Sequence, residues 1–189
     1  MGDRGMSTLI TSNLKHPSSS SNNLVLNSDG SVTGAGLFSS YAKIVDQKSA
    51  NTNGGSFSNG DWRTRDLNTE LWDADGIVSI SSNQFTLQAG TYYVSWICPA
   101  YFVDRHQSRL YNVTDSSTVQ ASGASYASSS GDSSESNSLG SARLTISGAK
   151  AFEIQHRSQS SNTSNGFGNG NQDWGESSIF TQVEIWKEN

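Results

Sequence analysis

Short runs of alternating apolar and polar residues, bounded by Gly, Asn, Asp and Ser, recur along most of this chain. Alternation with a period of two residues is typical of β-strands that bury one face. Nowhere do ten or more residues place apolar side chains at i, i+3, i+4 and i+7, the spacing that builds the buried face of a helix. Gly, Ser, Asn and Thr also interrupt every candidate helix. The sequence therefore predicts an all-β protein.

The alternating runs predict about ten strands in about 150 residues, a count typical of a two-sheet jelly-roll sandwich. The expected strands are Tyr41–Gln47, Trp62–Leu67, Gly76–Ser81, Gln84–Leu87, Thr91–Cys98, Arg109–Thr114, Thr118–Tyr126, Ser141–Ile146, Ala151–Arg157 and Ile179–Lys187. Gly90 and Gly148 each stand in a short link between two of these strands, so we expect both links to be tight turns of the hairpin type. The tracts Ser128–Ser138 and Ser158–Asp173 are too polar to be buried and are expected to be surface loops.

Charge and composition exclude several classes of protein. The 189 residues include 12 Lys and Arg against 17 Asp and Glu, a formal net charge of −5. Such a chain lacks the basic surplus that a phosphate backbone attracts, so we expect no nucleic-acid partner. It has no apolar run near the ~18 residues that span a bilayer, so no membrane insertion is expected. Aromatic residues make up 10% of the chain, which favours a packed core over disorder.

The single cysteine, Cys98, stands at the end of an expected strand. One cysteine forms no internal disulfide, and no neighbouring base or cation would lower its pKa, so we expect a small buried side chain rather than a reactive thiol. The amino terminus lacks the apolar stretch of a secretory signal. Folding in a reducing cytoplasm is therefore the expectation.

The first part of the chain differs from the rest. Its apolar patches are too short for a core, and Asn27–Gly30 is expected to turn a small hairpin that is marginal on its own in water. We therefore expect an extended attachment arm over residues 1–36, followed by a jelly-roll head over residues 37–189. The residues expected to make the attachment are Leu9, Ile10, Leu24, Val25 and Leu26.

Two expected strands carry large side chains on both faces, and a strand of this kind must be covered on both sides. In Thr91–Cys98, Tyr93 and Ile97 lie opposite a second apolar set. In Ile179–Lys187, alternation places Phe180 and Trp186 away from the aliphatic set that suits the core. One layer of the sandwich covers one face, and another copy of the chain is expected to cover the other. The predicted interface residues are Phe180, Trp186, Phe152, His156 and Tyr93.

Several of these segments resemble a known family. Phe85–Trp96, Arg109–Thr114, Ala151–His156 and Phe180–Trp186 look like the jelly-roll head found at the ends of bacteriophage fibres and on virion surfaces, which is similar to the trimeric tumour-necrosis-factor-like (complement globular-head-like) fold. The leader Ile10–Asn27 also resembles short leader segments of phage structural proteins. The resemblance covers most of the chain and implies a homotrimer with closed threefold symmetry.

No catalytic, cofactor or metal site is predicted. His106 stands between Asp104 and Ser108, but on one strand these three would point the same way rather than form a relay. His156 is expected to be a packed residue, and the alternative is a pH-sensitive or metal-capable cluster of three copies at a trimer axis. Asp73–Gly76 begins like a calcium loop but lacks its later ligands, so a turn is expected.

Four aromatic residues beside polar loops are possible ligand contacts, because a ring can stack on a sugar while neighbouring amides read its hydroxyls. The alternative, which we favour, is that each ring anchors a polar segment. These residues are Trp62, Trp72, Phe167 and Trp174.

The sequence and the resemblance together predict a non-enzymatic virion protein on the outer surface of a phage, assembled in the host cytoplasm. The expected partners are two further copies of the chain and other virion proteins, either the major capsid protein or a tail component. Capsid decoration or cementing is the favoured role because the chain has an arm and a head but no long shaft. The alternatives are a tail-fibre tip or adhesin that binds a host receptor or glycan, and a soluble lectin-like module.

Overall fold

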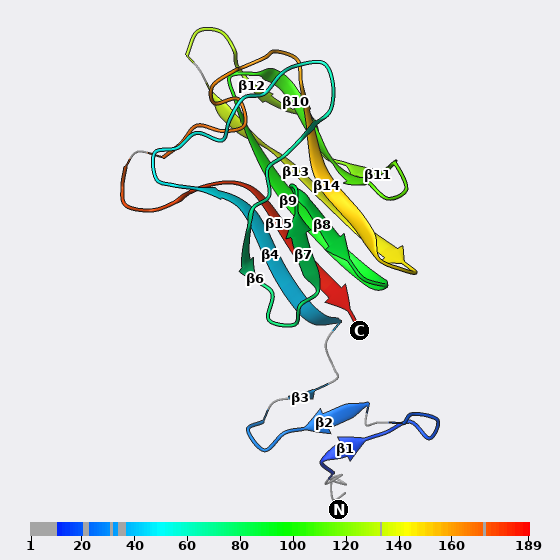
Figure 1. Ribbon diagram of the computed structural model, residues 1–189. Helices are drawn as coiled ribbons and strands as arrows, with labels where there is room; N and C mark the ends of the chain where they lie inside the picture. The colour runs from blue at the N-terminus through cyan, green and yellow to red at the C-terminus, as the bar shows by residue number, and fades with distance from the viewer. Residues whose placement is uncertain (1–10, 21–22, 31, 34–36, 133, 172) are drawn as a thin grey trace, which may run out of the picture. The chain divides into compact units, whose positions relative to one another are not determined.

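The computed structural model describes residues 11–20, 23–30, 32–33, 37–132, 134–171 and 173–189. The chain divides into two units, Met1–Leu37 with Asn189, and Phe38–Glu188. Strands make up the regular structure of both units (Figure 1). Within the described ranges there is no helix of the length and apolar character needed to cross a membrane.

The unit Phe38–Glu188, called the head below, is a sandwich of two antiparallel sheets, which confirms the predicted all-β jelly roll (Figure 1). The five-stranded sheet has the order β13 (Glu135–Ile146), β9 (Gly90–Tyr101), β15 (Ser178–Glu188), β4 (Phe38–Lys48) and β6 (Thr69–Trp72). The seven-stranded sheet has the order β11 (Ser117–Ala121), β10 (Asp104–Asn112), β14 (Lys150–Ser158), β8 (Gln84–Leu87) and β7 (Val78–Ser81), with β12 (Ser125–Ala127) paired to β10 and β5 (Arg63–Thr64) paired to β14.

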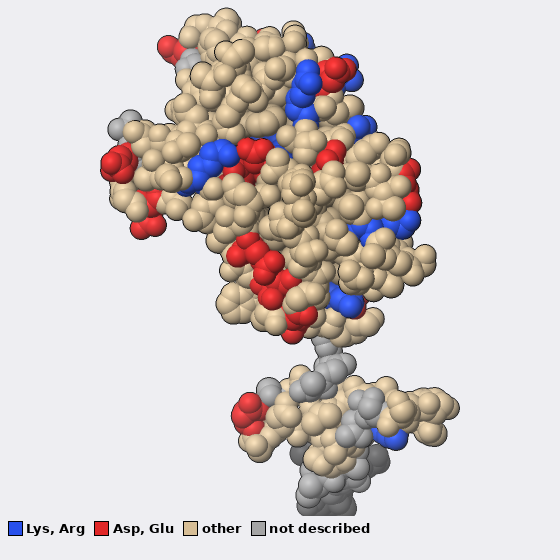
Figure 2. All heavy atoms as spheres, in the orientation of Figure 1, with Lys and Arg blue, Asp and Glu red and all other residues tan. Residues whose placement is uncertain are grey.

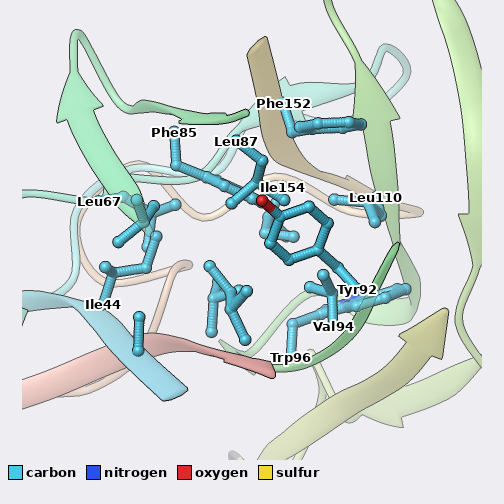
Figure 3. Packing of buried hydrophobic residues seen from close by; sticks show 14 of the residues in the cluster. Ile44, Leu67, Phe85, Leu87, Tyr92, Val94, Trp96, Leu110, Phe152 and Ile154 are labelled. Carbon is cyan, nitrogen blue, oxygen red and sulfur yellow. The ribbon is translucent and has the colours of Figure 1, made fainter. Parts of the chain in front are cut away.

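The core fills the space between the two sheets, where the inward residues of the alternating strands meet (Figure 3). Trp96 of β9 is 1% exposed, and its indole nitrogen donates a 2.8 Å hydrogen bond to Ser108 Oγ of β10. This bond satisfies the only polar atom of the largest buried side chain. Cys98 is buried in the same cluster, and burial raises the pKa of its thiol to about 11, so the prediction of a core cysteine is confirmed.

The tight hairpin of the head is not at the expected glycines. Ser82 and Asn83 link β7 to β8 with φ values of 53° and 64°, and positive φ at both positions makes a two-residue turn that matches the twist of the strands. Gly90 is the first residue of β9, after the link from β8, and Gly148 lies in the link from β13 to β14, so at both places the chain crosses from one sheet to the other. The hairpin prediction at these two glycines was therefore wrong, because neighbours along the chain are not neighbours in a sheet at these points.

A β-bulge in β15 reverses the expected faces at the start of that strand. Ile179 pairs with Gln47 and Gln182 with Val45, so three steps on β15 oppose two steps on β4. The extra residue shifts the alternation by one position. Phe180 consequently points into the head and is 3% exposed, whereas Ile179 is 38% exposed.

The polar tracts are more structured than the sequence indicated. Strand β13 begins at Glu135, inside the first tract, and the expected strand Thr118–Tyr126 divides into β11 and β12. In the second tract, Phe167 is 8% exposed and belongs to a small hydrophobic cluster with Phe57. The prediction that this tract lies wholly on the surface was therefore wrong.

The amino-terminal unit contains a small antiparallel sheet of β1 (Asn13–Leu14), β2 (Leu24–Leu26) and β3 (Val32–Thr33). Gly30 donates a backbone hydrogen bond of 3.1 Å to the carbonyl of Asn27, so the predicted hairpin is confirmed. Of the predicted attachment residues, Leu24 and Val25 are half-buried, Leu26 is 40% exposed, and Leu9 and Ile10 lie outside the described residues.

Candidate functional site

The outer face of the five-stranded sheet carries a row of aromatic side chains. Tyr93 on β9 lies opposite Trp186 on β15, which in turn lies opposite Tyr41 on β4. The indole centroid of Trp186 is 5.7 Å from the ring of Tyr93 and 5.4 Å from the ring of Tyr41. Phe38 extends the row, with its ring 6.4 Å from that indole. Neighbouring rings at these separations gain contact energy beyond their buried area, so the row is preorganised.

Two aliphatic residues extend this surface along β9 and β13. Ile97 and Leu139 are direct cross-strand partners and are 38% and 59% exposed. Ile97 shares the outward face with Tyr93 because the two residues are four positions apart on one strand. We call the resulting surface the apolar face; it consists of Phe38, Tyr41, Tyr93, Ile97, Leu139 and Trp186.

Charged pairs of both signs border the apolar face. Lys43 Nζ lies 3.3 Å from Glu184 Oε1 in the middle of the sheet. At its end, Arg143 donates two hydrogen bonds of 2.6 and 2.7 Å to the carboxylate of Glu188. These bonds raise the pKa of Arg143 and lower the pKa of Glu188. A surface that carries both signs can meet a second copy of itself with opposite charges facing.

Three of the five residues predicted for a trimer interface are buried within one chain. Phe152 and His156 are 0% exposed, and Phe180 is turned inward by the bulge in β15. Phe152 and His156 do share a face of β14, but this face packs against the other sheet. Their assignment to an interface was therefore wrong. Tyr93 and Trp186 lie on the apolar face, and their role in a trimer stays a prediction.

The four aromatic residues considered as ligand contacts lie in different environments. Phe167 is buried, with the guanidinium of Arg65 4.0 Å from its ring centroid, so it anchors its loop, as the favoured interpretation predicted, and is not an exposed ligand contact. Trp72, on β6, and Trp174, between β14 and β15, are 58% and 75% exposed. Trp62 is half-buried and lines a groove on the seven-stranded sheet. The structure does not bring the four rings together.

A buried arginine joins the loops at one end of the head, and the sequence analysis did not single it out. Arg65 is 0% exposed and donates three hydrogen bonds: Nε to Thr181 Oγ1 at 2.7 Å, Nη1 to the Pro99 carbonyl at 3.1 Å and Nη2 to the Phe167 carbonyl at 2.7 Å. Burial lowers its pKa. The only signal in the sequence was an arginine inside the expected strand Trp62–Leu67, a position that alternation alone does not assign to the core.

Two histidines form a buried pair between β10 and β14. His106 Nδ1 lies 2.9 Å from His156 Nε2, and His106 Nε2 lies 2.8 Å from Ser136 Oγ. Burial, aided by the charge of Arg65, lowers the pKa of His106 to about 4. Burial holds the pKa of His156 well below its usual value, with Arg65 and His106 adding to the effect. Both imidazoles are therefore neutral in the folded head at pH 7.

Acidification is expected to destabilise the head between pH 6.5 and pH 4. In this window the unfolded chain binds protons on these histidines and the folded chain does not, so the free energy of unfolding falls as the pH falls. At pH 5 the loss from His106 alone is about 2 kcal/mol. Urea unfolding at pH 7.5 and pH 5.0, at one protein concentration, measures it.

Burial raises the pKa of Asp46, so this carboxyl group makes the free energy of unfolding rise as the pH falls, opposite to the effect of the histidines. The variant H106N separates the contribution of His106 from that of Asp46. We expect a smaller difference between the two pH values for H106N than for the wild type, whatever its stability at pH 7.5. The variant H16N, in the amino-terminal unit, is the control and should keep the full difference. A difference between the two pH values that is as large for H106N as for the wild type would contradict the neutral pair.

The side chains around His106 are not arranged as a catalytic relay. Asp104 accepts hydrogen bonds from Ser129 and Ser160, which lower the pKa of Asp104 to about 2. Ser108 Oγ accepts from Trp96, as described above. Asp73, in the calcium-like segment, caps a turn instead, since its carboxylate accepts hydrogen bonds from the backbone N–H groups of Ile77 and Val78 where β7 begins. Among the described residues, no group of three or more His, Cys, Asp or Glu is placed to hold a metal ion.

Comparison with known proteins identifies the type of fold that the head adopts. No family model matches the chain, and no curated protein matches its sequence. The TNF Eiger from S. frugiperda matches with a TM-score of 0.53 and 10% identity, over 79% of this chain and 92% of that chain. Murine APRIL at pH 5.0 matches with a TM-score of 0.50 and 8% identity, over 78% and 98%. The globular domain of the zebrafish complement 1qA protein gives 0.43 and 16%, over 78% and 95%.

These similarities show the fold: the head is a jelly roll of the tumour-necrosis-factor-like type. This fold was the one indicated by the strand segments of the sequence. The resemblance to phage proteins is a separate expectation and stays a prediction.

Proposed function

We propose that this chain is a non-enzymatic structural protein of a bacteriophage virion, in which the head forms a homotrimer and residues 1–36 attach it to the particle. The observation that carries the proposal is the apolar face. Aromatic and aliphatic side chains gathered on one exposed sheet surface are typical of a surface that another protein covers. Trp, Tyr and Phe are also the residues that contribute most to protein interfaces.

A second copy of the chain fits this surface for two reasons. The face borders its own charge pairs, Lys43 with Glu184 and Arg143 with Glu188, so rotated copies can place opposite charges against each other. Closed cyclic symmetry also lets every copy use the same surface without leaving an open end. The number three follows from the resemblance to trimeric tumour-necrosis-factor-like heads.

The amino-terminal unit supports attachment to a larger surface. Leu14, Leu26 and Val32 are 45%, 40% and 48% exposed on a sheet with strands of only two or three residues. A sheet this small gains stability when its apolar side chains are covered by another protein. We place the protein on the outer surface of the virion, as a capsid decoration or cement protein bound to the major capsid protein.

A tail-fibre tip or adhesin that binds a host receptor is the second candidate, and the groove beside Trp62 favours it. The number of copies per purified virion, measured by quantitative mass spectrometry, separates the two roles. Hundreds of copies support decoration, whereas a multiple of three in the tens or fewer supports a fibre.

The trimer is expected to appear as a particle of about 61 kDa in light scattering, three times the 20.3 kDa of one chain. The double variant I97E/L139E should give a folded 20.3 kDa monomer. At the interface the two glutamates would be buried with unpaired charges, which destabilises the assembly. Both positions are exposed in the single chain, so folding of the head is not affected.

Tyr126 provides the matched control, since it is 55% exposed on β12 of the other sheet. Y126E adds one glutamate at a position of similar exposure and should remain trimeric. Circular dichroism verifies that all variants keep their β-structure. A wild-type monomer, or dissociation by Y126E and not by I97E/L139E, would contradict the assembly through the apolar face.

A further inference from the structure

A groove of about 360 Å³ opens on the seven-stranded sheet, where β12 and β5 flank the central pair β10 and β14. Its walls include Trp62, Arg105, Gln107, Arg157 and Gln159, and no Asp or Glu of the described ranges lines it. Sites for small molecules typically have volumes of this size and a few convergent polar groups. The groove lies on the seven-stranded sheet and the apolar face on the five-stranded sheet, so a ligand bound in the groove would not cover the apolar face.

Positive charge is concentrated around this groove in a chain of net charge −5. Four of its seven arginines belong to β5, β10 and β14. Charged side chains are sparse on the surface of the head in the view of Figure 2, where uncharged residues predominate. A cluster of arginines within such a surface is a local feature rather than a reflection of the overall composition.

Two of these arginines, Arg105 and Arg157, line the groove. Gln107 pairs with Arg157 across the strands, and Arg105 is the next outward residue on β10, so the two guanidinium groups are diagonal neighbours. In the described parts of the chain, neither arginine belongs to an ion pair. Arg105 Nη1 donates to Gln159 Oε1 at 3.2 Å, and this neutral amide leaves the charge uncompensated.

Trp62 provides an apolar wall of the groove, and contacts within the chain hold its indole in place before a ligand binds. The guanidinium of Arg109 lies 4.1 Å from the indole centroid of Trp62 and 4.7 Å from the ring centroid of Tyr111. Arg109 Nε is in turn bonded to Gln155 Oε1 at 2.8 Å. A side chain held in this way loses little conformational freedom when a ligand binds.

The side-chain amide of Gln107 is oriented so that it can accept a hydrogen bond from a hydroxyl group in the groove. Its Nε2 donates a 2.7 Å hydrogen bond to the Ser122 carbonyl, which determines the direction of the amide. The Oε1 atom then remains an acceptor beside the groove. The groove therefore combines two guanidinium groups that form no ion pair with a described residue, an aromatic wall and an oriented amide.

We propose that this groove binds a saccharide that carries a carboxylate group, such as a sialic or uronic acid. The carboxylate lies between Arg105 and Arg157, because the guanidinium fork matches its two oxygens. The sugar ring packs its C–H face on Trp62, and a hydroxyl group donates to Gln107. An inorganic anion would use the arginines but neither the indole nor the amide. The proposal does not depend on the trimer or on the virion.

Titration of the full-length chain with 3′-sialyllactose at low salt, followed by two-dimensional NMR, tests this proposal. We expect saturable binding that shifts the Trp62 indole signal, and binding at least about 10-fold weaker for lactose, which lacks the carboxylate. R105Q and R157Q should each weaken binding of 3′-sialyllactose by about 10-fold or more. K150Q removes one positive charge from the same strand as Arg157, at its far end, and should stay within twofold.

Four results would overturn the proposal. These are the absence of saturable binding, equal affinity for lactose, equal weakening by K150Q, and binding of inorganic phosphate that matches 3′-sialyllactose while the Trp62 signal stays unshifted. Light scattering on the same samples reports the oligomeric state separately. A monomeric wild type that still binds 3′-sialyllactose would contradict the proposed assembly and leave the groove assignment intact.

Discussion

The variant R65M is expected to lose about 3–5 kcal/mol of the free energy of unfolding of the head. Methionine removes the donors for Thr181 Oγ1 and for the carbonyls of Pro99 and Phe167, all in the interior. Buried acceptors without donors cost more than the bonds contribute when intact. The loss would be a large part of the 5–15 kcal/mol typical of a domain.

Urea unfolding at a fixed protein concentration measures this effect, because assembly makes the apparent stability depend on concentration. R157M is the matched control, since Arg157 is exposed on β14, and it should stay within about 0.5 kcal/mol of the wild type. R65K should recover only part of the loss, because an ammonium group cannot reach three acceptors in the planar geometry of a guanidinium. Equal stabilities of R65M and R157M would show that the buried arginine does not hold these loops.

The variant G140A is expected to destabilise the head by about 3 kcal/mol. Gly140 of β13 pairs with Trp96 of β9, and a methyl group at this position would overlap the indole. The indole is fully buried and bonded to Ser108, so it cannot move aside without breaking that hydrogen bond and opening the core. Urea unfolding at the same concentration gives the difference.

G148A is the control for this substitution. Gly148 lies in the link between β13 and β14, and an added methyl group would meet no atom within 4 Å. The alanine variant should therefore match the wild type or gain up to about 1 kcal/mol, since it reduces the entropy of the unfolded chain. If G140A proves as stable as G148A, the close contact between Trp96 and β13 is not as the structure describes it.

Local alternation predicted most strands of the head because it depends on neighbours along the chain. Gln84–Leu87 coincides with β8, and the inward positions Phe152 and Ile154 of β14 are buried as the pattern requires. The pattern does not say which element covers each face. Phe152 and His156 were assigned to an interface for this reason, although the opposite sheet of the same chain covers them.

The apolar face was only partly predictable. Tyr93, Ile97 and Trp186 were recognised as side chains on the second face of strands that are apolar on both sides. Leu139 was missed because the expected strand began at Ser141, whereas β13 begins at Glu135. The start of β13 lies in a serine-rich tract, where pairing with β9, rather than β-propensity, keeps the chain extended.

The sequence by itself determined the all-β class, the alternation of buried and exposed positions, the small hairpin of the amino-terminal unit and the core position of Cys98. The tertiary structure decided which strands pair, where the bulge turns Phe180 inward, how Arg65 is buried and how Trp62, Arg105 and Arg157 come to share one groove. The physical reason is the range of the interactions. Side-chain periodicity is local, whereas sheet pairing and buried hydrogen bonds join residues that are far apart in the chain.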